Sequence, residues 1–463
     1  MHVKKSAHFV KYKGFLMEPH IRNFFTGRVW AREAAPFPKE KIDQYIKRGL
    51  LQVKPAIGEG PVCQRCFNTR NRQFIYFNCA RCGKTCVYCR HCIQMGRMSS
   101  CTELLVWNGP LPVAGRHHRL EWKSQFTSLQ ANASRELADS MQERRHHLIH
   151  AVCGSGKTEI MFTAIHEALH RGERVCIATP RTDVVLELTP RLQAVFPQTT
   201  IHALYGGAPH SFSYASLIIA TTHQLYRFEQ AFDVMIVDEA DAFPYTFDES
   251  LQKAVKKAKK EKAPIAFVTA TPSYQLLQMK KEGGYSFIPS RYHGHPLPTP
   301  RFSSLWGYEK AIKKQNIPKK LKEWTVEKLT KNEPFLIFFP TVELMEKAIP
   351  LFQELDAAIE AVHAEDEKRK EKVMRLRNEE LKGLLTTTIL ERGITIKNVQ
   401  VAVVGAESDI FTASALIQIS GRVGRNKDFP SGDIIFFHHG ITVEMDTAKE
   451  EIERMNKEAF PDA

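Results

Sequence analysis

The sequence contains no run of about 18 apolar residues, the length that a membrane-spanning helix needs. Its first residues carry several lysines but no apolar h-region, so we expect no signal peptide and a cytoplasmic protein. Cysteine is rare outside one segment: of 10 cysteines, all but Cys153 and Cys176 lie between Cys63 and Cys101. In a reducing compartment such a cluster is typical of metal binding and not of disulfides.

Acidic residues are also in deficit. The chain has 65 Lys and Arg against 51 Asp and Glu, a formal net charge of +14, which favours a polyanionic partner. Hydrophobic residues make up 43% and charged residues 25%, which excludes wholesale disorder. The 463 residues are enough for about three domains.

Composition divides the chain into residues 1–105, 106–292 and 293–463. The first part is rich in Arg, Cys and aromatic residues, whereas the other two alternate short apolar runs with helix-like stretches. Such runs are typical of buried parallel strands; they occupy 174–180, 217–222, 234–240, 265–271, 335–340, 383–388, 399–405 and 433–439. A Pro- and His-rich linker, 291–301, separates the two series. We therefore expect an α/β fold with two tandem parallel-sheet domains after a small N-terminal domain.

A candidate phosphate-binding loop follows the apolar run LIHAV and precedes an amphipathic stretch. It consists of Gly154, Ser155, Gly156, Lys157 and Thr158. Glycines let backbone N–H groups approach the phosphates of ATP, Lys157 would reach the β- and γ-phosphates, and the Thr158 hydroxyl would bind Mg²⁺. Ala151 stands where the strict pattern has Gly.

Two carboxylates, Asp238 and Glu239, directly follow the apolar run VMIV and begin the motif DEAD. A carboxylate in this position can hold Mg²⁺, and its neighbour can orient the attacking water. Both motifs follow buried strands, and together they predict an ATP-hydrolysing site with Lys157, Asp238 and Glu239 as catalytic residues.

The last part of the chain carries QISGRVGR, which includes Gln418, Gly421, Arg422, Gly424 and Arg425. The two arginines are one helical turn apart, so both could reach a γ-phosphate bound on the other domain. With the segment TAT at 269–271, these motifs resemble those of superfamily-two helicases. The resemblance implies two RecA-like domains, with ATP contacted by Gln418 and catalysis assisted by Arg422 and Arg425.

Longer strings surround these motifs, namely IATPRTDVVLEL (177–188), ALYGG (203–207), ATTHQL (220–225), DEADAFPY (238–245), VHAEDEKRKEKV (362–373), TTTILERGIT (386–395), GAES (405–408) and ALIQISGRVGR (415–425). Together they resemble one family, ComFA, the ATPase of bacterial competence. The resemblance implies a motor that pulls single-stranded DNA through a membrane channel, at the inner face of the cell membrane, with other competence proteins and as an oligomer. The replication-restart helicase PriA is the alternative, and a zinc-organised adaptor with a switching ATPase is a third hypothesis.

The same resemblance implies the DNA contacts. The matching residues are Thr179, Pro180, Arg181, Gly206, Gly207, Thr221, Thr222, Thr386, Thr387 and Arg392. Hydroxyl and backbone donors at strand ends bind phosphates without reading bases, so binding would tolerate any sequence and weaken with salt. Glu391 would couple DNA to nucleotide, and Gln130 matches the glutamine that can read adenine.

Cysteine pairs with CxxC spacing predict Zn²⁺, because two such pairs complete a tetrahedral thiolate site. Spacing alone favours Cys63, Cys66, Cys79 and Cys82, whereas the family resemblance attaches to Cys63, Cys66, Cys89 and Cys92, the set we adopt. The remaining Cys79, Cys82 and Cys86 would be unligated or form a second site with Cys101.

Between these pairs lies RNRQFIYF (70–77), whose Arg70, Arg72, Phe74 and Tyr76 are either the core of a hairpin or a surface for single-stranded DNA. The two motor domains should have cores of their own, so we expect them to fold without the zinc segment.

Overall fold

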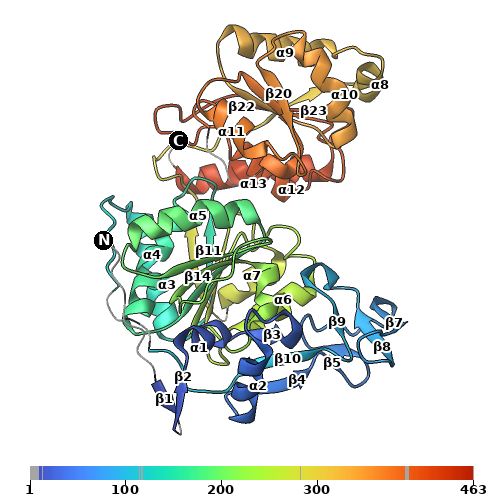
Figure 1. The fold of residues 1–463 in the computed structure, drawn as a ribbon. Helices are drawn as coiled ribbons and strands as arrows, with labels where there is room; N and C mark the ends of the chain where they lie inside the picture. The colour runs from blue at the N-terminus through green and yellow to red at the C-terminus, as the bar shows by residue number, and fades with distance from the viewer. Residues whose placement is uncertain are drawn as a thin grey trace.

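The computed structural model describes residues 10–12, 14–113, 115, 118–281, 283–391 and 396–461. Arg392 of the predicted DNA contacts lies outside these residues. Two parallel sheets follow one another along the chain, and an N-terminal module lies against the first of them (Figure 1). Within the described ranges, no helix is long and apolar enough to cross a membrane.

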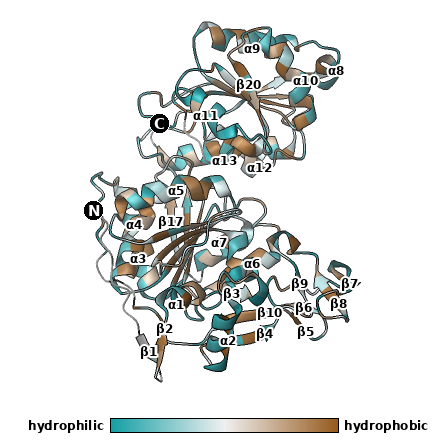
Figure 2. Ribbon diagram, viewed as in Figure 1, coloured by the Kyte–Doolittle hydropathy of each residue, from teal (hydrophilic) through white to brown (hydrophobic). Residues whose placement is uncertain are grey.

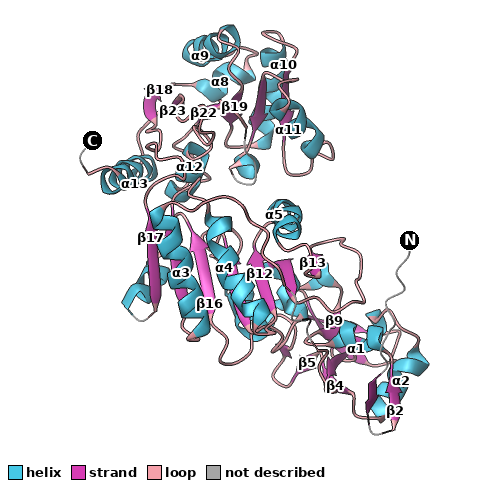
Figure 3. Cartoon of the chain, turned by 90° about the vertical axis from the view of Figure 1, so that its left-hand side faces the viewer, coloured by secondary structure: helices cyan, strands magenta, loops and turns pink. Residues whose placement is uncertain are grey.

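The first parallel sheet has seven strands in the order β13-β14-β12-β15-β16-β11-β17. They are β11 (His147–Ala151), β12 (Val175–Thr179), β13 (Ile201–Leu204), β14 (Leu217–Thr221), β15 (Val234–Asp238), β16 (Ile265–Thr269) and β17 (Gly284–Ile288). Its helices are α3 (Ser128–Gln142), α4 (Lys157–His170), α5 (Thr182–Val195), α6 (Glu249–Ala258) and α7 (Tyr274–Gln278). Strands β11, β12, β14 and β15 are buried along their whole length, as expected for a sheet covered on both faces. Figure 3 shows α3 and α4 together on one face.

The second parallel sheet has the order β18-β23-β22-β19-β21-β20. Its strands are β18 (Arg301–Ser304), β19 (Phe335–Phe338), β20 (Ile359–Val362), β21 (Gly383–Thr386), β22 (Gln400–Val404) and β23 (Ile434–His438). Its helices are α8 (Tyr308–Lys313), α9 (Lys319–Thr330), α10 (Val342–Gln353), α11 (Arg369–Arg377), α12 (Ala413–Ser420) and α13 (Val443–Ala459). Helices α12 and α13 lie on the side of this sheet that faces the first one (Figure 1).

The N-terminal module is built from short antiparallel strands. The strands are β1 (Val10–Tyr12), β2 (Phe15–Met17), β3 (Val29–Ala31), β4 (Leu51–Pro55), β5 (Ile57–Gly58), β6 (Val62–Cys63), β7 (Phe74–Asn78), β8 (Thr85–Cys89), β9 (Met98–Ser99) and β10 (Glu103–Trp107), and the helices are α1 (Pro19–Phe25) and α2 (Lys39–Lys47). Strand β10 pairs with both β3 and β4, and β8 pairs with both β7 and β9. The two main parts of the module are thus the three-stranded sheet β3-β10-β4 and the cysteine-bearing hairpin β7-β8, to which β9 adds a third strand.

The N-terminal module shares a hydrophobic core with the first parallel-sheet domain. Cys63 and Phe74 of the module belong to the same buried cluster as Met235 of β15 and Val255 of α6. The Arg174 guanidinium, fully buried, donates from Nη1 to the carbonyl oxygen of Thr26 at 3.1 Å. Strands of the large sheet and parts of the module both carry hydrophobic residues (Figure 2). The first parallel-sheet domain therefore has one core of its own, between the sheet and α3, α4 and α5, and shares a second core with this module on the face covered by α6. That the domain folds without the zinc segment stays a prediction.

Candidate active site and metal centre

The phosphate-binding loop connects the end of β11 to the start of α4. Gly154 and Gly156 have φ angles of 83° and 80°, in the left-handed region that favours glycine. Lys157 begins the helix, and its Nζ donates to the carbonyl oxygen of Ala151 at 3.3 Å. The Ser155 hydroxyl is buried and, within the described part of the chain, has no hydrogen-bond partner. The loop therefore has the strand–loop–helix geometry that a phosphate group requires.

Gln130 supports this loop from α3. Its Nε2 donates to the carbonyl oxygen of Ser155 at 2.7 Å, while its Oε1 accepts from the backbone N–H of Thr127 at 2.9 Å. Thr127 completes a capping box at the start of α3. A Cβ on Gly156 would collide with Gln130 Nε2, so that position must remain glycine. The Gln130 amide thus ties the loop to the capped start of α3, and reading adenine through it stays a prediction.

Asp238 and Glu239 lie at the carboxyl end of β15, facing the loop. Asp238 is buried, and burial raises the pKa of its carboxyl, while the charge of Lys157 opposes that shift. Its Oδ1 accepts from the backbone N–H of Glu239 at 3.0 Å. Glu239 has a φ of 55°, so the chain turns sharply as soon as the strand ends. A cation beside Asp238 would restore the charged carboxylate.

Asp241, the last residue of DEAD, connects three motifs. Its carboxylate accepts from Thr269 at 2.6 Å and from Thr271 at 2.7 Å, both in the TAT segment. Ser414 of α12 donates to the same carboxylate at 3.2 Å and lies 2.7 Å from the Thr271 hydroxyl. Sequence reasoning noted TAT and missed Ser414, because nothing local marks a serine that lies 173 positions from its partner.

The two predicted arginines follow α12 and reach the same place from the second domain. Arg422 is buried; burial, then repulsion from Arg425, lowers its pKa to about 9. Its Nε donates to the carbonyl oxygen of Glu391 at 2.8 Å, and Arg425 Nε donates to that of Gly421 at 2.8 Å. Two crowded guanidinium groups form a site for an anion.

A cavity of about 500 Å³ lies between the two parallel-sheet domains. Nearly all of the predicted ATP-site residues line it, namely Gly154, Gly156, Lys157, Thr158, Asp238, Glu239, Gln418, Arg422 and Arg425. Trp122 and Tyr292, which sequence reasoning missed, add aromatic surface. Loop, carboxylates and arginines thus surround one space large enough for a nucleotide.

The inter-domain linker forms part of this site. Arg291, only 2% exposed, donates from Nη1 to the carbonyl oxygen of Gly424 at 2.6 Å. The backbone N–H of Tyr292 donates to the carbonyl oxygen of Gly154 at 3.1 Å. His293 also contacts the Gly424 carbonyl, at 3.0 Å. The linker therefore joins the phosphate-binding loop directly to the arginine-bearing segment.

The predicted DNA-contact residues lie at the carboxyl ends of neighbouring strands. Strands β13, β14 and β12 are adjacent, which brings together the ends that carry Gly206, Gly207, Thr221, Thr222, Thr179, Pro180 and Arg181. In the second sheet, Thr386 ends β21 and Thr387 follows it. The hydroxyls of Thr179 and Thr222 are buried and lack a hydrogen-bond partner among the described residues. Arg181 bridges the domains, since its Nη2 donates to the carbonyl oxygen of Ile389 at 2.7 Å.

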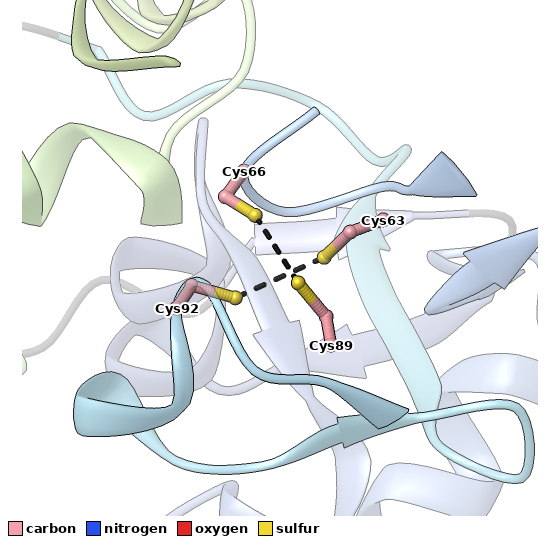
Figure 4. A group of neighbouring side chains, drawn as sticks. All are labelled: Cys63, Cys66, Cys89 and Cys92. Carbon is pink, nitrogen blue, oxygen red and sulfur yellow. Dashed lines mark hydrogen bonds between the residues drawn. The ribbon is translucent and has the colours of Figure 1, made fainter. Parts of the chain in front are cut away.

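Eight cysteines form two groups of four. Cys63, Cys66, Cys89 and Cys92 converge from β6, β8 and the turns that follow them (Figure 4). The Sγ atoms of Cys63 and Cys92 are 3.8 Å apart, and those of Cys66 and Cys89 are 3.6 Å apart. Four sulfurs at about 2.3 Å from one zinc ion would stand about 3.8 Å apart, so this donor set fits Zn²⁺.

The sequence left two roles open for the segment 70–77, the core of a hairpin or a surface for single-stranded DNA, and its residues differ in which role their burial fits. Phe74 is buried in the core shared with the motor, whereas Tyr76 is 69% exposed. Arg70 and Arg72 are also exposed. Only Phe74 therefore acts as hairpin core, and the other three side chains are open to solvent.

Comparison with known proteins identifies the family. Residues 10–106 match the competence protein ComFA N-terminal domain, 123–274 the res subunit of type III restriction enzymes, and 316–427 the helicase conserved C-terminal domain. The competence protein ComFA of Bacillus subtilis is 42% identical over 98% of this chain and 97% of its own length. This chain belongs to the ComFA family. The ComFA of Streptococcus pneumoniae is 38% identical over 82% of this chain and 90% of its own.

Solved helicases share the fold of the two parallel-sheet domains. The DEAD-box helicase Mss116 has a TM-score of 0.54 at 17% identity, covering 68% of this chain and 70% of its own. The Mycobacterium smegmatis helicase Lhr has a TM-score of 0.53 at 17% identity, covering 71% of this chain and 50% of its own. The predicted fold class is confirmed: two tandem RecA-like domains follow an N-terminal module whose cysteines could bind zinc. This ComFA-family chain is a competence-related, helicase-type enzyme that hydrolyses ATP with Mg²⁺.

Proposed function

We propose that this chain is an ATP-driven motor that moves along single-stranded DNA and draws transforming DNA into the cytosol during competence. The observation that carries the proposal is the cavity between the domains, which Lys157 and Asp238 line from one side and Arg425 from the other. A nucleotide there would contact both domains, so binding and hydrolysis would close and open the cleft.

In this proposal each predicted residue has one role at the nucleotide. Lys157 binds the β- and γ-phosphates, Thr158 and Asp238 hold Mg²⁺, and Glu239 orients the attacking water. Arg422 and Arg425 stabilise the charge that develops on the γ-phosphate, and Gln418 contacts ATP. The lowered pKa of Arg422 supports this role, because an arriving phosphate would compensate a buried charge that Arg425 now repels.

The DNA would cross the carboxyl ends of the strands in both sheets. The buried hydroxyls of Thr179 and Thr222, which have no hydrogen-bond partner among the described residues, support this path, because buried polar groups normally find partners. Arg181 and Glu391, 3.4 Å apart across the domain interface, would separate when DNA enters. The structural relatives Lhr and Mss116 were solved bound to single-stranded DNA and single-stranded RNA, respectively. Contacts to phosphates from Pro180, Gly207, Thr221, Thr386, Thr387 and Arg392 complete the proposal.

The remaining parts of the proposal concern assembly and metal. The motor would act in the cytoplasm at the inner face of the membrane, as an oligomer, with an uptake channel and other competence proteins as partners. The comparisons do not favour the PriA-like alternative, since a ComFA protein matches the chain over 97% of its own length. Cys63, Cys66, Cys89 and Cys92 would hold Zn²⁺, a structural ion that supplies folding free energy to the module.

Two measurements on the full-length protein test the motor. ATP turnover should rise with single-stranded DNA and much less with duplex DNA. Streptavidin should be displaced from one end of a biotinylated strand, at a rate that depends on ATP. Lys157→Ala should abolish turnover and displacement yet still bind the DNA, because Lys157 lines only the nucleotide cavity. Turnover that DNA leaves unchanged would instead support the adaptor hypothesis.

A further inference from the structure

Cys63, Cys66, Cys89 and Cys92, the proposed zinc ligands, are called the zinc quartet below. A second group of four cysteines lies at the other end of the hairpin formed by β7 and β8. Cys79 and Cys82 belong to the turn that joins β7 to β8, Cys86 lies on β8, and Cys101 lies between β9 and β10. One Sγ from each lies within 4.8 Å of all the others. The separations are 3.7 Å for Cys79 and Cys101 and 3.3 Å for Cys82 and Cys86.

Packing alone does not account for these thiols. The zinc quartet is part of a hydrophobic cluster, but Cys79, Cys82, Cys86 and Cys101 belong to none of the clusters formed by the described residues. Cys82 and Cys101 are partly open to solvent. Buried cysteines normally behave as small apolar side chains inside a core. Four thiols that converge outside a core therefore need another reason to do so.

An arginine lies against this group, as one does against the zinc quartet. Arg81 Nη2 donates to Cys101 Sγ at 3.0 Å, and its Nη1 pairs with Glu33 at 2.8 Å. In the zinc quartet, Arg65 Nη2 donates to Cys92 Sγ at 3.0 Å. Four thiolates around a divalent ion keep a net negative charge, and outer donors of this kind stabilise it. The two groups therefore share their donor number, their sulfur spacing and a cationic neighbour.

We propose that Cys79, Cys82, Cys86 and Cys101 form a second tetrahedral thiolate site that binds Zn²⁺. The edge of a zinc–thiolate tetrahedron is about 3.8 Å for Zn–S bonds of about 2.3 Å. The Cys79–Cys101 separation of 3.7 Å equals it closely, and the Cys82 and Cys86 sulfurs, 3.3 Å apart, would move apart by about 0.5 Å on binding the ion. The ion would tie the turn at 79–82 to the chain that enters β10, and thereby fix the hairpin tip against the three-stranded sheet. Because this site is more open than the first, it should lose zinc to a chelator sooner.

Metal analysis of the full-length protein tests the proposal. Protein purified under reducing conditions and dialysed into metal-free buffer should contain two zinc ions per chain. Replacing both Cys82 and Cys86 by Ser should leave one ion, and replacing Cys66 and Cys89 should remove the other. Each variant is first checked by circular dichroism. One zinc per wild-type chain that survives the Cys82 and Cys86 replacements would overturn the proposal.

A second readout does not depend on those variants. Wild-type protein refolded with Co²⁺ should show the visible bands of tetrahedral cobalt–thiolate coordination, with an intensity that saturates at two equivalents. Timed release to a chelator should have two phases, and Arg81→Ala should accelerate only the faster phase. Arg81→Lys, which keeps the charge, should restore most of the difference. Saturation at one equivalent, or disulfides between these cysteines in protein kept reduced, would contradict a second site.

Discussion

The thiol of Cys153 donates to Oε1 of Gln418 at 2.9 Å, across the interface between the two motor domains. Cys153 directly precedes the glycines of the phosphate-binding loop, and Gln418 lies one turn before the arginines. The nucleotide site is thus assembled by contact between segments 265 positions apart. Neither domain alone contains it.

Arg425→Ala should reduce ATP turnover by about 10³-fold or more, the usual effect of removing an arginine that stabilises a transferring phosphoryl group. Arg425 lines the cavity from the second domain. Steady-state hydrolysis with saturating single-stranded DNA measures the loss. The matched control is Lys427→Ala, an exposed cation two residues away that does not line the cavity and should leave the rate unchanged. A tenfold effect or less would mean that this arginine does not act on the phosphate.

Arg291→Met should separate stability from activity. Burial lowers the pKa of Arg291 to about 10, and its Nε and Nη2 have no partner in the described part of the chain. Methionine removes a buried charge and keeps much of the volume, while His293 still contacts the Gly424 carbonyl. The melting temperature should therefore hold or rise, whereas ATP turnover should fall at least about tenfold, since the arginine segment loses its support.

The control for this change is Arg301→Met, which removes an exposed arginine paired with Asp433 far along the linker. This substitution should change neither the melting temperature nor the ATP turnover by much. If Arg291→Met turned over ATP at the wild-type rate, the linker would have no part in positioning Arg425.

Cys63→Ala should destabilise more than the N-terminal module. Losing one thiolate would remove the proposed zinc ion, and Cys63 shares its core cluster with Met235 and Val255 of the first parallel-sheet domain. We expect zinc loss, a lower melting temperature for the whole first domain, and reduced basal ATP turnover. Calorimetry, zinc content and hydrolysis on one preparation measure the three effects. Unchanged basal turnover would show that the motor stands without the module despite the shared core.

Stability should fall as the solution is acidified from about pH 7 to about pH 5. Burial lowers the pKa of His147 from 6.5 to about 4, and both ring nitrogens lie against serine hydroxyls, at 2.9 Å from Ser140 and 3.0 Å from Ser286. Below pH 6.5 the unfolded chain binds the proton more readily than the folded chain does. The free energy of unfolding therefore falls by about 1.4 kcal/mol per pH unit until the pKa of the folded state is reached. Urea midpoints measure the slope, which His147→Gln should reduce; an equal slope would exclude His147 as the cause.

The strands could be predicted from the sequence wherever an apolar run was continuous. The run 265–271 became β16 and the run 383–388 became β21. Strand β17 was missed, because its sequence, GYSFI, mixes glycine, serine and aromatic residues. The ATP-site residues were found because their motifs are local and follow buried strands.

Long-range contacts could not be predicted in the same way. The linker was assigned only a spacer role, because prolines and histidines dominate its composition, yet Arg291 is buried between the loop and the arginine segment. Ser414 and the core shared with the N-terminal module depend on surfaces that meet only after the sheets form. The spacing and periodicity of residues along a sequence do not indicate such long-range contacts.

The hydrogen bond between Ser414 and Asp241 is a weak contact that holds the two parallel-sheet domains together. Thr269 and Thr271 lie in the same domain as Asp241, so their hydrogen bonds to its carboxylate remain when the domains separate. Losing the hydrogen bond from Ser414 therefore does not leave the carboxylate without partners. A hydrogen bond from a neutral donor to a carboxylate contributes about 1.5–3 kcal/mol, a few times the thermal energy at room temperature. In the proposed motor this contact would open and re-form as the domains part and close, and the nucleotide, which contacts both domains, would set which position persists.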